Sequence, residues 1–292
     1  MYKLLAPLAC KLGTQHARTL ATIAMKLASA AGTAQPPAML KRNVMGLEFP
    51  GPVGLAAGFD KHGKLYPCLA RLGFGFAEIG TVTPTPEPGR SHGLAIVTAN
   101  LARHPRPRAI PLGVSISMNR ATPPQRMAQD YLACLTKVWH HVDYITLNLG
   151  VRAGPDLHLT ENRSVLRTVF AAIKEEQARL AATHQVRRPI TVKVDQARGD
   201  TAELLACVRE FSFDGLILSG TGGKDNHRQA LSALEWVAQE LHGIMPVISV
   251  GGIRTPQDAR DRLAAGAALV QLYTGLMKSG PYLVRQINRV ML

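Results

Sequence analysis

The sequence has no long apolar run, few aromatic residues and no closely spaced cysteines. No segment of eighteen or more residues is apolar and free of charge, so we expect no transmembrane helix. Aromatic residues make up 5% of the chain, which is few for a surface that stacks single-stranded nucleic acid. The cysteines lie too far apart for a CxxC pair, so we expect neither a metal site nor a disulfide framework. They are Cys10, Cys68, Cys134 and Cys207.

Acidic residues are also scarce, and the formal net charge is +14. An excess of this size suggests a polyanionic partner, such as nucleic acid, an anionic membrane surface or a phosphate-bearing ligand. The basic residues are scattered and show no zinc-finger spacing, so we do not expect nucleic-acid binding. The 292 residues, 46% of them hydrophobic, suit a globular protein with a large core.

Residues 1–34 contain no Asp or Glu at all. Basic residues spread among Leu, Ala, Ile and Met predict one or two amphipathic helices, which the pair Pro36-Pro37 ends. Two interpretations are open: a helix pair that lies on an anionic membrane face, or a helical cap packed on the rest of the protein. The basic residues are Lys3, Lys11, Arg18 and Lys26.

Eight short apolar runs follow, each about as long as a strand buried on both faces. Amphipathic helical patterns separate most of them, and this alternation predicts parallel strands joined by right-handed crossovers. Eight units favour a closed (β/α)₈ TIM barrel, although a doubly wound sheet would show similar alternation. The runs are Val53–Ala57, Phe76–Gly80, Leu112–Ile116, Asp143–Asn148, Ile190–Val194, Gly215–Ser219, Val247–Val250 and Leu269–Tyr273. The clearest helical patterns are Gln125–Val138, Ser164–Ala181, Ala202–Phe211, Ala230–Leu241, Pro256–Ala265 and Pro281–Met291.

The last two predicted strands end in glycines that suit a phosphate site. Gly251-Gly252 follows the seventh run, and Tyr273-Thr274-Gly275 closes the eighth. Glycine lets backbone N–H groups approach a phosphate closely, and barrels often bind phosphate between these two loops. A tight turn is the alternative for either glycine end alone.

Lys193 lies between valines on the fifth predicted strand. A buried ammonium group needs a polar partner. That partner is either a flavin, whose reduced anion a nearby cation stabilises, or a carboxylate in a structural ion pair.

Five segments, taken in order, resemble dihydroorotate dehydrogenases of the membrane-linked, quinone-using class. They read VMGLEFPGPVGLAAGFDKHGK, LGFGFAEIGTVTPTPEPG, VDYITLN, VISVGGI and LAAGAALVQLYTGLMKSGP. The resemblance extends over almost the whole chain. It implies an FMN-bearing TIM barrel that oxidises dihydroorotate to orotate in pyrimidine synthesis. It also implies N-terminal helices through which ubiquinone enters, and so a peripheral protein on the cytoplasmic face of a bacterial inner membrane.

Residue by residue, the resemblance carries over the flavin half of the family site. It implies that Lys61 binds the carboxylate of a small anionic substrate. It implies flavin or phosphate contacts from the following residues: Ala57, Gly58, Thr81, Ser115, Asn148, Lys193, Ser219, Gly251, Gly252, Tyr273 and Thr274. Ser115 replaces a family asparagine, and Ser219 begins the segment that replaces Asn-Thr-Thr.

The substrate half departs from the family pattern. Val151 stands where the family has its serine base, and Ala153 replaces a substrate-binding asparagine. A segment rich in asparagine after the second strand is absent, and the chain there is shortened. Valine cannot accept a proton, and a general base usually contributes about 10²–10⁴-fold. We therefore predict that the family activity is lost or altered, and we assign no catalytic residue.

Three residues could replace the missing base: Ser115, Ser117 and His158. Arginines in the altered segments are either a new anion site above the flavin or ordinary surface charges. These arginines are Arg103, Arg106, Arg108 and Arg152.

The sequence therefore predicts two parts, an N-terminal helical segment of residues 1–40 that faces the membrane, and an FMN-binding barrel of residues 41–292. Its function is that of a diverged FMN oxidoreductase with a quinone as a candidate acceptor. The alternative is a non-catalytic flavin- or nucleotide-binding protein with a regulatory or assembly role.

Overall fold

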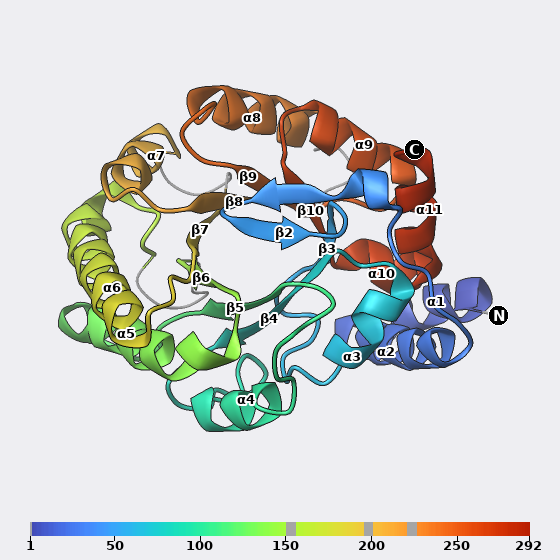
Figure 1. The fold of residues 1–292 in the computed structure, drawn as a ribbon, viewed down its shortest axis with the longest axis horizontal. Helices are drawn as coiled ribbons and strands as arrows, with labels where there is room; N and C mark the ends of the chain where they lie inside the picture. The colour runs from blue at the N-terminus through green and yellow to red at the C-terminus, as the bar shows by residue number, and fades with distance from the viewer. Residues whose placement is uncertain (1, 150–155, 196–200, 221–226) are drawn as a thin grey trace.

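A computed structural model describes residues 2–149, 156–195, 201–220 and 227–292. Eight parallel strands form a closed barrel in the order β10-β3-β4-β5-β6-β7-β8-β9. The closure confirms the TIM barrel and excludes the doubly wound sheet (Figure 1). The strands are β3 (Val53–Leu55), β4 (Phe76–Val82), β5 (Leu112–Ile116), β6 (Tyr144–Asn148), β7 (Ile190–Asp195), β8 (Gly215–Ser219), β9 (Val247–Val250) and β10 (Leu269–Leu272).

Helices surround the barrel and cover its outer face (Figure 1). The six predicted helical patterns all form helices. They are α5 (Met127–Val138), α6 (Arg163–His184), α7 (Thr201–Glu210), α8 (His227–Glu240), α9 (Pro256–Ala264) and α11 (Tyr282–Val290). Three shorter helices complete the ring: α3 (Tyr66–Leu69), α4 (Leu94–Leu101) and α10 (Thr274–Ser279).

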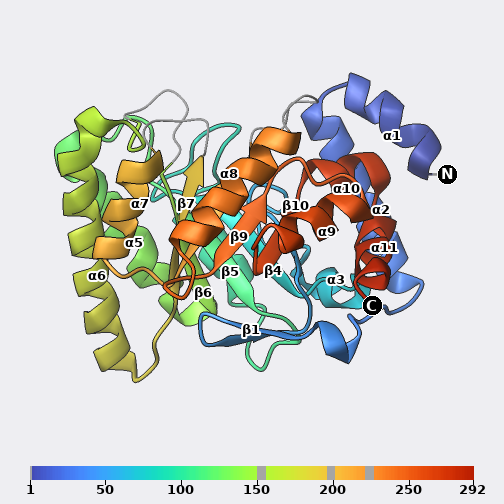
Figure 2. The ribbon, with the colours of Figure 1, turned by 90° about the horizontal axis from the view of Figure 1, so that it is seen from above.

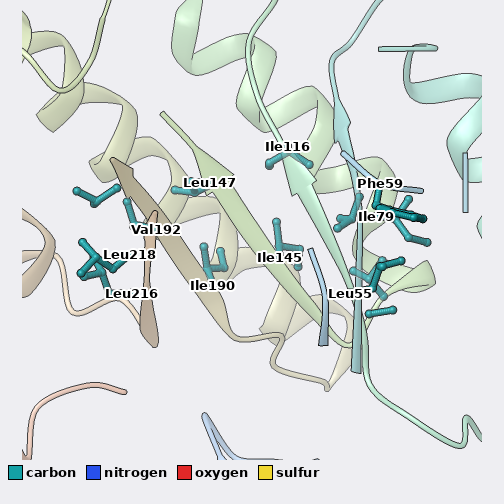
Figure 3. Close-up of a cluster of buried hydrophobic side chains, with 14 of the residues drawn as sticks. Leu55, Phe59, Ile79, Ile116, Ile145, Leu147, Ile190, Val192, Leu216 and Leu218 are labelled. Atoms are coloured by element: carbon teal, nitrogen blue, oxygen red, sulfur yellow. The ribbon is translucent and has the colours of Figure 1, made fainter. Parts of the chain in front are cut away.

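Alternate strand residues point to opposite faces of the barrel wall. Outward-facing aliphatic residues such as Ile145, Leu147, Ile190, Val192 and Leu216 are fully buried in the layer between strands and helices (Figure 3). The inward-facing residues are more polar. Glu78, Thr146 and Thr191 form one hydrogen-bonded group there: Thr146 Oγ1 lies 2.9 Å from Glu78 Oε2 and 2.8 Å from Thr191 Oγ1.

An antiparallel hairpin of β1 (Arg42–Val44) and β2 (Leu47–Phe49) lies at the N-terminal end of the barrel strands (Figure 2). Phe49 is fully buried, with its ring 5.3 Å from that of Phe76 and 6.5 Å from that of Tyr144. Both partners stand at or near the start of barrel strands. The hairpin therefore closes this end of the barrel, and the opposite end is left for a ligand.

The N-terminal segment forms two helices, α1 (Tyr2–Lys11) and α2 (Thr14–Ala30). They lie at one side of the barrel beside α10 and α11 (Figure 2). Ala17, Ala21 and Met25 of α2 are buried, and the Tyr2 hydroxyl lies 2.9 Å from the Leu276 carbonyl. The cap interpretation is therefore correct for the inner face of the helices. Their outer face still exposes large apolar side chains: Leu4, Leu5, Leu8, Leu12, Ile23 and Leu27.

Candidate functional site

The residues predicted to bind a cofactor gather at the C-terminal ends of the barrel strands. Asn148 is in register with Lys193, two positions after the inward-facing pair Thr146 and Thr191. Because side chains alternate along a strand, Asn148 and Lys193 also face the barrel axis. Strand registers place Ser115 and Ser219 on the same inward side. In a TIM barrel this end carries the chemistry.

Three of these side chains form a hydrogen-bonded group. Asn148 Nδ2 donates to Thr81 Oγ1 at 2.9 Å, and Thr81 Oγ1 lies 3.4 Å from Ser115 Oγ. The backbone carbonyl of Asn148 accepts from Ser117 Oγ at 3.1 Å and from the Tyr131 hydroxyl at 2.8 Å. Asn148 is thus fixed from both sides, and its amide has a defined position at the top of the barrel.

The turn after β3 brings Ala57 and Gly58 to the same rim. Gly58 has a φ of +90°, which glycine adopts without strain. Its N–H donates to the Gly80 carbonyl at 2.5 Å, and a Cβ added at Gly58 would lie 3.4 Å from the Tyr273 ring. Arg18 Nη1 of α2 donates to the Gly58 carbonyl at 3.2 Å. This contact joins the helical segment directly to the turn.

The loops after β9 and β10 form the predicted phosphate site, which we call the phosphate corner. Positive φ angles at its glycines suit a backbone that binds phosphate. Gly251 and Gly252 have φ of +99° and +74°, so two successive residues are left-handed. A Cβ at Gly251 would lie 2.4 Å from the Gly220 carbonyl oxygen, and one at Gly275 would lie 2.3 Å from the Ile253 carbonyl oxygen. The loops after β9 and β10 therefore touch. Within the described residues, no group accepts a hydrogen bond from the N–H of Gly251 or Gly252.

Tyr273 and Thr274 stand at the end of β10, beside this corner. The Tyr273 ring lies 5.7 Å from the ring of Phe59 in an edge-on arrangement. Thr274 is the first residue of α10, so its N–H has no partner within the helix. An anion between the two loops would meet several backbone N–H groups.

Lys193 is partly buried and faces a carboxyl group deeper in the barrel. Glu78 Oε2 accepts from Thr146 Oγ1 and, at 3.0 Å, from Gln271 Nε2. Burial raises the pKa of Glu78, and the positive charge of Lys193 opposes that rise. Glu78 Oε1 has no hydrogen-bond partner among the described residues. Glu78 is therefore an electrostatic partner of Lys193, although the two form no ion pair within 4.0 Å in the described part of the chain.

Lys61 lies in a loop shaped by Asp60. The Asp60 carboxylate accepts N–H bonds from residues 62–65, at 2.7 to 3.3 Å. Lys61 Nζ donates to the Gly89 carbonyl at 2.6 Å. Partial burial, together with the charge of Arg18, lowers the pKa of Lys61. Arg18 is therefore a second cation close to Lys61, and its positive charge disfavours the protonated form of Lys61.

Two histidines stack next to Lys61, one of them in the same loop. The rings of His62 and His92 lie 3.8 Å apart at 26°. Burial lowers the pKa of His62, with further lowering by His92 and Lys64. The stack joins the loop after β3 to the segment that replaces the asparagine-rich motif.

Arg106 and Arg108 do not lie above the candidate cofactor site, which corrects the anion-site hypothesis for these two residues. Arg106 Nε donates to Asp143 Oδ1 at 2.9 Å, and Arg108 Nη1 lies 3.1 Å from the same oxygen. Asp143 immediately precedes β6, so both arginines lie at the N-terminal end of the strands. Arg103 is exposed, and Val151, Ala153 and Arg152 lie outside the described residues.

The three candidate replacement bases are all engaged. His158 is 1% exposed; its Nε2 accepts from the Asp195 N–H at 3.1 Å and its Nδ1 lies 2.8 Å from Asp156 Oδ1. Ser117 Oγ donates to the Asn148 carbonyl and accepts from Arg90 Nη2 at 2.9 Å. Ser115 is fully buried beside Thr81.

Sequence reasoning missed three residues that support the site: Arg18, Arg90 and Tyr131. Arg90 bridges the segment after β4 to Ser117 and to the Met118 carbonyl. Its partner Glu87 lies three positions earlier, a spacing that hinted at an ion pair. The contacts of Arg18 and Tyr131 join distant segments and left no local signal.

No cluster of three or more His, Cys, Asp or Glu side chains placed to hold a metal ion occurs in the described ranges. Among the helices that the structure describes, none has the length and apolar character to cross a membrane.

Comparisons with known proteins agree with this geometry. A family model described as "Dihydroorotate dehydrogenase" matches residues 39–92 and 215–292. A "Dihydroorotate dehydrogenase (quinone)" of Azotobacter vinelandii is 35% identical over 86% of this chain and 84% of its own length. One of Nitrosospira multiformis is 33% identical over 335 aligned positions, 100% of this chain and 96% of its own. The ligand-free dihydroorotate dehydrogenase of Eimeria tenella superposes with a TM-score of 0.80 at 26% identity, over 94% of this chain and 93% of that one.

Proposed function

The chain belongs to the dihydroorotate dehydrogenase family, and from that premise we propose that it is an FMN-binding oxidoreductase whose family reaction is lost or altered. The proposal rests on a difference between two sets of residues at the C-terminal ends of the barrel strands. The residues that suit a flavin are together and ordered, while the position of the family base is a valine and each candidate replacement is engaged.

The residues at the rim fit FMN. The left-handed pair Gly251-Gly252 and the loop with Tyr273 and Thr274 would hold the phosphate through backbone N–H groups. The ring system would rest against Ala57 and Gly58, with polar contacts from these side chains: Thr81, Ser115, Asn148, Lys193 and Ser219. Bound there, FMN would take a hydride from a reduced substrate and pass electrons to an acceptor. Lys193 would place a positive charge where the reduced flavin becomes negative.

Among the residues that the structure describes, none is free to perform the proton transfer of the family reaction. His158 is held by hydrogen bonds at both ring nitrogens, so its Nε2 lone pair is already used by the Asp195 N–H. Ser117 has no described histidine or carboxylate partner to activate it. We therefore expect dihydroorotate oxidation to be slower by about 10²–10⁴-fold, the usual contribution of a general base.

The aligned length with the Nitrosospira multiformis relative supports shortened loops. It spans 335 positions, although this chain has 292 residues. The family model also leaves residues 93–214 unmatched, which include Val151, Ala153 and most of the segment that replaces the asparagine-rich motif. Changes that fall together on the substrate side favour a different small anionic substrate, for which Lys61 and Arg18 supply positive charge.

The N-terminal helical segment supports a proposal for the electron acceptor and for the location of the protein. Residues 1–34 expose six large apolar side chains and contain no acidic residue. This pattern suits a helix pair lying in the interface of an anionic membrane. We propose that residues 1–34 hold the protein on the cytoplasmic face of a bacterial inner membrane, where a quinone accepts the electrons.

The visible spectrum of the purified protein, followed by anaerobic addition of dihydroorotate, tests the proposal. Flavin that is present and stays oxidised supports it. Absence of flavin after incubation with FMN would refute the cofactor assignment, and rapid bleaching would refute the loss of family chemistry. The variant Val151→Ser supplies a control, because a restored hydroxyl should increase bleaching by dihydroorotate above the unmodified chain.

A non-catalytic flavin- or nucleotide-binding protein is the second candidate. The engaged state of Ser115, Ser117 and His158 favours it, because a rim without a free base suits binding alone. FMN that is bound but cannot be reduced by any anionic donor or oxidised by any quinone would favour this candidate over the first.

A further inference from the structure

Two adjoining cavities lie on the side of the barrel away from the candidate flavin site, along α11. One, of about 320 Å³, lies between α11 and the chain that follows α2, with Gln35, Arg285 and Arg289 among its walls. The other, of about 270 Å³, is lined by Ala28 and Ala31. Both contain Tyr282 and Arg285, so they form one groove, which we name the α11 groove. Figure 2 shows α11 beside α2 on this side of the molecule.

Two cations line the α11 groove, and in the described ranges neither has an acidic partner. Arg285 and Arg289 are exposed, and within the described residues neither forms an ion pair. They stand four positions apart on one helix, where like charges disfavour each other by about 0.2–0.5 kcal/mol. Such a pair is favourable once an anion lies between the two guanidinium groups, because arginine matches phosphate geometry well.

Acidic residues are absent from both segments that build this side of the molecule. Residues 1–47 and 262–292 contain ten Lys and Arg and no Asp or Glu. The two segments pack on each other through contacts of α10 with α1 and α2. The positive potential around the groove is therefore not cancelled locally, and it would attract anions from solution.

Apolar side chains border the same groove. Tyr282 is 54% exposed and Leu292 is 65% exposed, and both line the larger cavity. The groove thus combines cations and apolar surface, which are the features of an amphiphile site.

We propose that the α11 groove binds the headgroup of an anionic phospholipid. The phosphate lies between Arg285 and Arg289, and the first acyl carbons rest on Tyr282 and Leu292. The site rests on the membrane contact proposed above and adds to it a specific lipid position outside residues 1–34.

Titration of the full-length protein with dihexanoyl phosphatidylglycerol, which dissolves as monomers, tests the site by calorimetry. The double variant Arg285→Gln/Arg289→Gln should bind at least about tenfold more weakly, since two charge-assisted hydrogen bonds are lost. The matched control, Arg42→Gln/Arg103→Gln, removes the same charge from two other exposed positions and should bind like the unmodified protein. Equal weakening in both variants would overturn the site in favour of general electrostatic attraction.

Two further experiments distinguish a lipid from free phosphate as the ligand, and the α11 groove from the membrane contact of residues 1–34. Inorganic phosphate should bind much more weakly than the lipid, and equal affinity would replace the lipid site by a phosphate site. Flotation with vesicles of phosphatidylglycerol and phosphatidylcholine tests the membrane contact by itself. Unmodified protein that floats while the Arg285→Gln/Arg289→Gln variant keeps full affinity for the short-chain lipid overturns only the groove. Protein that fails to float yet binds the short-chain lipid through the two arginines overturns only the membrane contact.

Discussion

The phosphate corner gives a prediction that separates cofactor binding from fold stability. Gly252 has a φ of +74°, and a Cβ added there would lie 3.5 Å from the nearest described atom of Arg262, an ordinary contact. Gly243 has a φ of +72°, and a Cβ there would meet nothing within 4 Å. The variants Gly252→Ala and Gly243→Ala therefore impose nearly the same backbone cost, about 1–2 kcal/mol each for a left-handed alanine.

The two variants should differ only in their affinity for FMN. A methyl group at Gly252 keeps a phosphate from its close approach to the backbone, and loss of one charge-assisted hydrogen bond costs about 1.5–3 kcal/mol. This cost corresponds to roughly 10- to 100-fold weaker binding. Gly243 lies between α8 and β9, at the N-terminal end of the barrel strands and away from the corner, so Gly243→Ala should bind FMN normally.

Urea unfolding of the flavin-free proteins measures the first effect, and quenching of flavin fluorescence measures the second. If Gly252→Ala and Gly243→Ala are equally destabilised and also bind FMN equally, the corner does not hold the phosphate. If Gly252→Ala is far less stable than Gly243→Ala, the matching of the two backbones is wrong and the affinity difference loses its meaning.

Phe49→Ala should lower the free energy of unfolding by about 3–5 kcal/mol, because it leaves a cavity at the closed end of the barrel, as urea unfolding will show. A loss under 1 kcal/mol would mean that the hairpin does not seal that end. The lowered pKa of His62 means that the unfolded chain binds its proton more readily, so stability should fall as pH drops below 6.5. Unfolding curves at pH 7.5 and 5.5 measure this loss of stability. The loss should be smaller in His62→Asn and unchanged in the exposed control His242→Asn. Asn148→Ala removes the donor to Thr81, so bound FMN should show weaker affinity and a shifted absorption maximum. An unchanged spectrum and affinity would remove Asn148 from the site.

The barrel could be predicted from the sequence because each strand is buried on both faces and so appears as an apolar run. Seven of the eight runs begin at the first residue of the strand that forms, and the run at Asp143 begins one residue early. The ends were less accurate. β4 continues to Val82, past the predicted end at Gly80, through a register shift that no local pattern reveals.

The hairpin at the closed end was not predicted. Its two strands have three residues each, too few to show alternation, and only Val44 and Phe49 are buried. Its turn places Met45 at a φ of +54°, and a non-glycine residue rarely adopts that conformation. Tertiary packing of the hairpin on the barrel, through Val44, Met45 and Phe49, offsets the cost of this turn.

The candidate site was predictable where side chains on strands determine it. Asn148 and Lys193 face inward because of their place in the strand, which the sequence fixes once the strands are known. The role of Arg18 could not be predicted, because Arg18 and its partner Gly58 lie 40 positions apart in the sequence. Of the two interpretations of Arg106 and Arg108, the anion site is excluded because both contact Asp143, which stands just before β6 and so at the N-terminal end of the strands, opposite the site.

The Tyr2 hydroxyl that contacts the carbonyls of Leu276 and Met277 has a consequence for synthesis of the chain. The first helix finds its partner only after nearly all of the 292 residues have been made, and β3 likewise waits for β10. At roughly 5–20 residues per second, that delay lasts about 15–60 seconds. Throughout it, the surfaces of α1 and α2 that later pack on α10 are uncovered. The nascent helical segment is therefore free to meet a membrane or a chaperone before the barrel can close.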